Sequence, residues 1–444
     1  MKNFYTRLTL LFLSATLVWS CDVLDQNPEM SITDDQAFVS KSSTQAALTG
    51  VYSALQSGNY YGQNYVTLGY LPGDNVEWVG SFNYFQQVDA NRLTADNSTI
   101  TGVWRAIYST INGANHIIGK VQSVEDPLFS QQEKDQIQGE AYFIRALAYF
   151  DLARGWGGVP IVLTYTQSPD DGAGIGRSSR EETYAQVLED LIQAESLLSD
   201  NVNRNRATRH SVRALRARLH LYLEEWDEAE RYASQLIDHP AFTLVQPYET
   251  FIQNKNSEES ILELAYDNAN RNNHNGYFLP ANLGGRLEWR PTEEFIGLVK
   301  NEEVGGDRVV LIAEEEGVTY GNLYHRSGTG DDPAYLLRIA EQYLIRAEAR
   351  AHQNDLTGAA EDLNQVRRRA GLSDRSADSR EELLLAIENE RRIEFAFEGH
   401  RWFDLVRTGR ADEVLGVTDT DRWLFPIPLN DLNADDDLTQ NDGY

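Results

Sequence analysis

Aromatic side chains set among amides and charged groups are the residues of this chain best suited to chemistry. They gather in two irregular stretches, about residues 58–97 and about residues 240–335. Flat rings can cover the apolar C–H faces of a sugar, while Asn, Asp and Arg bond to its hydroxyls. The pattern favours a sugar-binding face, although ordinary loop packing would also explain any one of these rings. The candidate ligand-binding residues are Asp74, Asn75, Trp78, Tyr84, Tyr277, Arg286, Trp289 and Tyr320.

Catalytic patterns, in contrast, are not found in the sequence. The eight histidines are scattered, without an HExxH pair. Gly172, Gly174 and Gly176 are spaced like part of a phosphate loop, but no Gly-Lys-Ser follows them, and Asp435-Asp436-Asp437 lacks the frame of a calcium loop. We therefore expect no enzyme, no metal and no cofactor. A surface hydrolase is the weakest alternative, because its two carboxylates need a separation that only the fold sets.

Cys21 is the only cysteine in the 444 residues, and it follows a short leader. Residues 1–20 have a basic start and an apolar segment, Leu8 to Val18, that is too short to span a bilayer. The stretch Leu17-Val18-Trp19-Ser20-Cys21 resembles a bacterial lipobox, in which the cysteine is lipidated after cleavage. An ordinary leader with a stray cysteine is the alternative. We expect a lipoprotein signal peptide over 1–20 and a mature chain, 21–444, that meets the membrane through its lipid anchor alone.

Composition narrows the choice of partner. The net charge of −29 disfavours nucleic acid and anionic lipid head groups as ligands. With Cys21 used for lipid, no disulfide can form, so that packing alone must hold the fold together.

Hydrophobic periodicity and helix breakers predict a mostly α-helical protein. The two irregular stretches interrupt the helices and include short strand-like pieces such as 260–265. Loops of this length inside a compact domain are usually functional. The expected helices span about 35–57, 98–122, 131–154, 180–199, 208–224, 227–238, 335–352, 356–370, 379–398 and 400–408.

A diverged internal repeat runs through these helices. Leu215-Arg216-Ala217 aligns with Ile345-Arg346-Ala347, and a third copy begins at Ile144-Arg145-Ala146. Each copy predicts a helix, a tight turn and a second helix with small residues at the crossing. This is the pattern of tetratricopeptide-like helical hairpins, of which we expect about four.

Five segments in the same order resemble the SusD/RagB family of surface nutrient-binding lipoproteins of Bacteroidetes. The resemblance covers nearly the whole chain and is specific as a set. The segments are Gly139–Phe150 with Arg154–Pro160, Thr208–Trp226, Tyr343–Ala349 with Asn364–Arg367, Glu390–Arg392 with Glu398–Arg407, and Phe425–Pro428 with Gln440–Tyr444.

The resemblance implies an all-α dominated, single SusD-like domain over 21–444. It also implies an outward-facing lipoprotein of the outer membrane that binds an oligosaccharide or similar nutrient. The partner would be a SusC-like, TonB-dependent barrel that receives the nutrient. The alternative is a tetratricopeptide-like scaffold that binds peptides or proteins, which an exposed apolar or charged groove along the repeats would favour.

Charged residues near the C-terminus have two interpretations. Glu390, Arg391, Arg392, Glu398 and Arg401 lie at helical spacings that bring opposite charges together. Catalysis by this cluster is one hypothesis, and a structural ion-pair network is the other. The family resemblance agrees with the structural role.

Replacing the candidate lipidation site gives the first test. Cys21→Ser should yield either soluble, unlipidated protein or uncleaved precursor, because no thiol remains to receive the lipid. Fractionation of cells that express the variant measures this. Partition into the outer membrane at the wild-type level would refute the lipoprotein prediction.

Overall fold

The computed structural model describes residues 37–166, 174–376 and 379–444. The leader, Cys21 and Gly172 lie outside these ranges, so the predictions made for them stay predictions.

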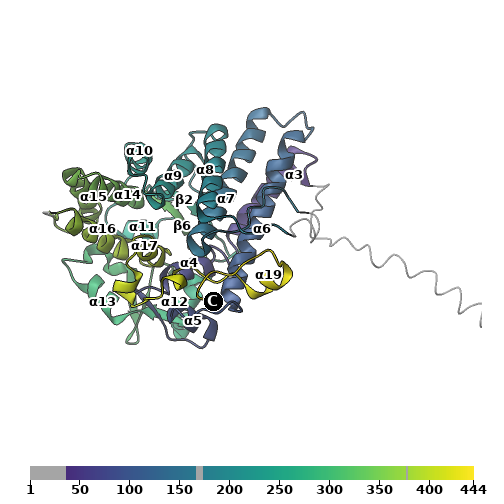
Figure 1. Ribbon diagram of the computed structural model, residues 1–444. Helices are drawn as coiled ribbons and strands as arrows, with labels where there is room; N and C mark the ends of the chain where they lie inside the picture. The colour runs from purple at the N-terminus through teal and green to yellow at the C-terminus, as the bar shows by residue number, and fades with distance from the viewer. Residues whose placement is uncertain (1–36, 167–173, 377–378) are drawn as a thin grey trace, which may run out of the picture.

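Helices dominate the fold, as the sequence predicted, and ten of them match the expected ones within a few residues (Figure 1). Two starts differ most, since α3 begins at Lys41 and not near residue 35, and a strand precedes the helix that was expected from residue 335. The ten are α3 (Lys41–Leu55), α6 (Ser98–Lys120), α7 (Gln131–Trp156), α8 (Arg180–Leu197), α9 (Arg209–Tyr222), α10 (Trp226–Ile237), α14 (Ile339–His352), α15 (Leu356–Arg369), α16 (Arg380–Glu394) and α17 (Arg401–Arg407).

Shorter elements fill the irregular stretches and the C-terminal region. The short helices are α4 (Asn64–Tyr70), α5 (Asn83–Asp89), α11 (Glu249–Gln253), α12 (His274–Phe278), α13 (Glu293–Lys300), α18 (Ala411–Leu415) and α19 (Leu429–Ala434). The strands are β1 (Val76–Trp78), β2 (Ser260–Leu264), β3 (Trp289–Pro291), β4 (Ile312–Glu315), β5 (Val318–Gly321) and β6 (Ala334–Arg338). They form three antiparallel pairs, β1 with β3, β2 with β6 and β4 with β5.

The long helices pack as four neighbouring pairs, α3 with α6, α7 with α8, α9 with α10, and α14 with α15. Figure 1 shows these helices following one another from α3 to α15 across one side of the molecule. Most of the short elements, among them α4, α5, α12 and α13, lie on the other side. The observed fold is thus all-α dominated with tetratricopeptide-like hairpins and small β insertions. None of the described helices is both long and apolar enough to cross a bilayer.

The repeated Arg-Ala pair has a physical role. Arg145 in α7 bonds to Asp190 in α8 at 2.7 Å, and Arg346 in α14 bonds to Asp362 in α15 at 2.7 Å. In both hairpins the arginine therefore ties the first helix to the second. Arg216 in α9 departs from this rule. It pairs with Glu195 of the preceding helix α8, and its guanidinium stacks on the ring of Tyr232 in α10.

Fully buried charges join the second irregular stretch to the helical scaffold. Arg338, at the end of β6, contacts Glu398 at 2.6 Å and 2.8 Å, and Glu259 and Glu394 at 3.0 Å each. Its guanidinium also lies 4.2 Å from the centre of the Phe251 ring. Because a buried charge without a partner is costly, this arginine holds three distant segments in one arrangement.

Removing the shared arginine should destabilise the protein strongly. Arg338→Leu leaves three buried carboxylates short of a partner, which costs about 3–5 kcal/mol. Arg368→Leu is the matched control, since Arg368 pairs with Glu361 and Asp374 at the surface and its loss should hardly change stability. Urea unfolding followed by circular dichroism measures both. Equal effects of the two changes would contradict the role given to Arg338.

Glu398 gives the network a pH dependence. Burial raises the pKa of Glu398 from 4.5 to about 7, with repulsion from Glu394 and Glu259 adding to the effect and Arg338 opposing it. A carboxyl whose pKa is raised on folding favours the folded state most below pH 4.5 and loses that contribution as pH rises to about 7. Glu398→Gln should therefore gain stability relative to wild type between pH 5 and pH 8. Parallel melting temperatures of the two proteins over this range would refute the assignment.

Candidate functional site

The pairing of β1 with β3 brings the two irregular stretches together. Trp78 lies opposite Trp289 in this ladder, and Glu77 lies opposite Arg290. Arg290 also bonds to Glu77 at 2.8 Å. The two stretches that the sequence singled out separately therefore form one surface.

Trp289 is the centre of this arrangement but is itself fully buried. The Tyr277 ring stacks on it with centroids 4.8 Å apart and planes 13° apart, and the Phe85 ring meets it edge-on at 4.8 Å. Tyr70 and Phe278 approach its other sides. Trp289 thus supports the rings around it and, in this conformation, offers no surface to a ligand.

An outer aromatic layer lies beside this centre. The rings of Phe82 and Tyr84 stack with centroids 5.1 Å apart and planes 15° apart, and the exposed Arg286 guanidinium lies 4.4 Å from the Phe82 centroid. Tyr84 meets Phe85 at 4.7 Å, which joins the outer layer to the inner one. We call Trp78, Phe82, Tyr84, Tyr277 and Arg286, which are all half-buried or exposed, the aromatic surface.

Glu288 fixes the loop that carries Phe82. This buried carboxylate accepts a hydrogen bond from the Ser81 backbone N–H at 2.9 Å and from the Phe82 backbone N–H at 3.4 Å. Arg286 approaches it at 3.6 Å. The sequence analysis did not identify Glu288, because nothing in its local pattern marks a glutamate that binds another loop.

The electrostatics of the aromatic surface keep the phenol of Tyr84 neutral. Partial burial raises the pKa of Tyr84, and Tyr277 and Glu288 add to the shift while Arg286 opposes it. Burial likewise raises the pKa of Asp89 to about 6, although this carboxyl accepts a hydrogen bond from the Trp78 backbone N–H at 3.1 Å. At neutral pH the surface thus offers a phenol hydroxyl, an exposed guanidinium and carboxylates, all of which can bond to sugar hydroxyls.

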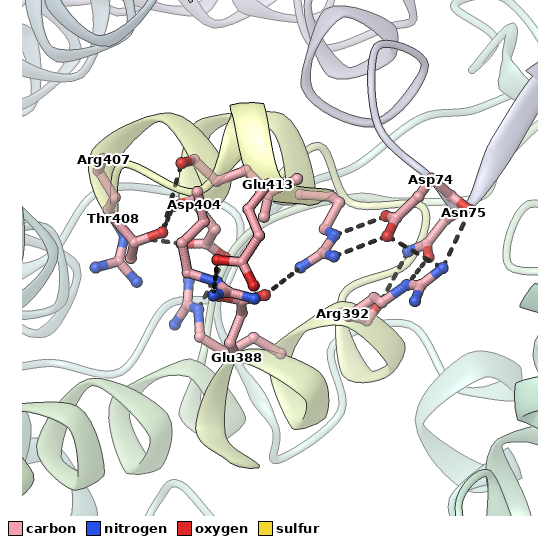
Figure 2. A network of polar contacts seen from close by, with 12 residues as sticks. Asp74, Asn75, Glu388, Arg392, Asp404, Arg407, Thr408 and Glu413 are labelled. Atoms are coloured by element: carbon pink, nitrogen blue, oxygen red, sulfur yellow. Dashed lines mark hydrogen bonds and ion pairs between the residues drawn. The ribbon is translucent and has the colours of Figure 1, made fainter. Parts of the chain in front are cut away.

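Asp74 and Asn75 lie at the base of β1 and are held by arginines of the C-terminal helices. Figure 2 shows both side chains turned toward Arg392. Arg401 clasps the Asp74 carboxylate through two bonds of 2.7 Å and 2.8 Å, and Arg392 donates to the Asn75 side-chain oxygen at 2.9 Å. Although burial opposes it, pairing with Arg401 and Arg392 lowers the pKa of Asp74. These two candidates anchor β1 to the scaffold.

Tyr320, the remaining candidate, is buried in β5 opposite Ala313. Its strand packs near β3, but among the described residues no ring contact joins Tyr320 to the aromatic surface. The candidates therefore divide by position. Trp78, Tyr84, Tyr277 and Arg286 reach the surface, Asp74, Asn75 and Trp289 brace it from below, and Tyr320 lies at its margin.

Metal binding finds no support in the described parts of the chain, where no cluster of three or more His, Cys, Asp or Glu side chains is arranged to hold an ion. The C-terminal charges that were the catalytic hypothesis, Arg391, Arg392 and Arg401, instead pair with carboxylates of neighbouring elements at 2.7–3.2 Å. The observed geometry is that of a structural ion-pair network.

Two family models match this chain. The model described as "SusD family" matches residues 315–422, and the model described as "Starch-binding associating with outer membrane" matches residues 22–223. Between them they cover most of the hairpins and the first irregular stretch.

Relatives extend the similarity to the full length. SusD-like protein P38 of Formosa agariphila is 28% identical over 98% of both chains. The starch-binding protein SusD of Bacteroides thetaiotaomicron is 34% identical, but over only 24% of this chain and 21% of its own.

Solved structures agree in fold. A putative sugar-binding protein from Bacteroides vulgatus superposes with a TM-score of 0.79 at 26% identity, covering 92% of this chain and 99% of its own. A laminarin-binding SusD-like protein gives a TM-score of 0.79 at 23% identity, covering 91% of this chain and all of its own.

Proposed function

The chain belongs to the SusD/RagB family, and from this membership we propose that it is a non-catalytic, surface-exposed lipoprotein of the outer membrane. It binds an oligosaccharide or similar nutrient at the aromatic surface and delivers it to a SusC-like, TonB-dependent barrel. Capture is non-covalent, and the chain supplies no reacting group.

One observation carries the proposal of a sugar site, namely the register that sets Trp78 opposite Trp289. This pairing turns two sequence-distant loops into one cluster in which some rings are buried and others reach solvent. A sugar needs a rigid aromatic platform, because a ring that must first be ordered costs conformational entropy on binding. Trp289 and Phe85 supply that rigidity by packing beneath the exposed rings.

The roles of the candidate residues follow from their positions. Tyr84 and Tyr277 offer ring faces or edges to the apolar side of a sugar, while Arg286 and the Tyr84 hydroxyl bond to its polar edge. Trp78 borders the same surface. Asp74, Asn75 and Trp289 act indirectly, because they fix β1 and the aromatic platform. Tyr320 lies at the margin of the aromatic surface and bounds it there.

The anchor and the partner complete the proposal. Lipid on Cys21 would tether the domain to the outer membrane, in keeping with the family description of proteins associating with that membrane. The helical hairpins would then dock on the barrel, which leaves the irregular side of the molecule, with its aromatic surface, for the ligand (Figure 1).

Alanine changes at the aromatic surface test the sugar site. Tyr84→Ala and Tyr277→Ala should each weaken glycan binding by about 2 kcal/mol, because each removes an aromatic anchor. This corresponds to roughly thirtyfold in affinity. A glycan array followed by calorimetry on the best ligand measures the change. Tyr343→Ala, which alters a half-buried tyrosine on α14, is the matched control and should bind normally.

Trp289→Ala separates support from contact. It should weaken binding and also lower the melting temperature, since it empties a fully buried position. Wild-type binding by both tyrosine variants, or no glycan bound by wild type, would refute the proposed site.

A further inference from the structure

A groove of about 450 Å³ lies among the helices, and the proposed sugar site uses none of its residues. It is bounded by the end of α9, the start of α10, the end of α14, the solvent-facing side of α16, and the stretch from α17 to Arg410. Its volume is in the range of sites for small organic ligands. The groove therefore runs between the third and fourth hairpins, and it contains no residue of β1 or β3.

One wall of the groove is apolar. The Trp226 ring stacks on His352 with centroids 3.9 Å apart and planes 4° apart, which fixes the indole in place. Leu384 and Leu385 of α16 line the same groove, and Leu385 is 44% exposed. A large aliphatic side chain left this exposed beside a fixed indole provides a surface for an apolar group of a ligand.

Arg391 lines the groove and is buried, yet it is incompletely bonded. Only its Nε donates a hydrogen bond in the described structure, to Asp404 at 2.8 Å, and its Nη1 has no partner there. The neighbouring Arg407 differs, because its Nε bonds to Asp404 at 2.9 Å and its two Nη atoms bond to Glu348 at 2.6 Å and 2.8 Å. Figure 2 shows Asp404 and Arg407 in this network. An unmet buried donor is costly, but because Nη1 is covered as well as unbonded, it can meet a ligand acceptor only if the Arg391 side chain shifts toward the groove.

The charge around the groove selects the ligand further. Its lining has five carboxylates against three guanidinium groups. Glu224 and Glu381 lie exposed at its edge, where Glu381 also pairs with the exposed Arg380 at 3.2 Å, and Asp404, Glu348 and Glu388 are engaged by arginines that line the groove. The excess of negative charge disfavours an anion and favours a cationic group near the edge.

We propose that this groove is a second binding site, for short peptides with a free amino terminus. A peptide carbonyl oxygen accepts a hydrogen bond from Arg391, an aliphatic side chain lies on Leu385 and Trp226, and the terminal ammonium lies near Glu224 and Glu381. This assignment gives Arg391 a role beyond the structural one that its sequence pattern predicted. It does not depend on the sugar site, because the two sites share no residue. Since the groove lies among the hairpins proposed to dock on the barrel, the assignment applies to the chain before it docks.

Calorimetry with the tripeptide Leu-Leu-Ala, amidated at its C-terminus, tests the proposal on the full mature chain. The free-amino peptide should bind, and its N-acetylated form should bind about tenfold more weakly, because acetylation removes the charge that the edge carboxylates attract. Leu385→Asp and Glu381→Gln should each cause a loss of similar size. Both positions are exposed, so the fold should tolerate the changes.

Matched controls lie away from the groove. Leu128→Asp alters another exposed leucine and Glu293→Gln another glutamate in the first turn of a helix, and neither should change peptide binding. Tyr84→Ala should also leave it unchanged, which separates this site from the aromatic surface. The proposal would be overturned if the tripeptide does not bind or if its acetylated form binds equally well. It would also be overturned if an oligosaccharide that still binds the Tyr84→Ala variant displaces the tripeptide from the protein.

Discussion

The buried charge of Arg338 is the constraint on which the arrangement of this protein depends. This residue ends β6 and immediately precedes α14, so that it stands where the second irregular stretch returns to the helical scaffold. Its guanidinium reaches Glu259 beside β2, Glu394 at the end of α16 and Glu398 just beyond that helix. A buried ion pair adds little net stability, but it penalises every arrangement in which a partner is missing. The network therefore specifies how the insertion sits on the helices.

A second set of arginines does the same for the first irregular stretch. Arg401 and Arg392 come from the C-terminal helices and hold Asp74 and Asn75 at the base of β1 (Figure 2). With β1 anchored and β3 carried by the other stretch, the two strands meet and place Trp78 beside Trp289. The aromatic surface thus rests on ion pairs that never touch it. A substitution of Arg392 or Arg401 should therefore be tested first for its effect on the stability of the fold and only then for its effect on sugar binding.

Arg391 and Arg407 show how similar residues in one network can differ in function. Both contact Asp404, and together they hold the pKa of that carboxyl well below its usual range although burial opposes its ionisation. Arg407 has all three of its nitrogens engaged, whereas Arg391 uses one. That difference gives the groove its proposed donor. A helical scaffold of this kind can then carry a proposed sugar site on its insertions and a proposed peptide site among its repeats.

The sequence by itself determined the helices and their pairing, because amphipathic periods, caps and the repeated Arg-Ala pair are local features. It located both irregular stretches and the residue types of the aromatic surface. It did not separate Tyr84 from Trp289, since an aromatic ring has the same local pattern whether it forms a platform or the core beneath it. It also placed Asp74 and Asn75 among ligand contacts, because their arginine partners lie some three hundred residues further along the chain. The pairing of β1 with β3 and the incomplete bonding of Arg391 were decided by tertiary structure alone, since strands of three residues and the partners of a buried guanidinium leave no local pattern in the sequence.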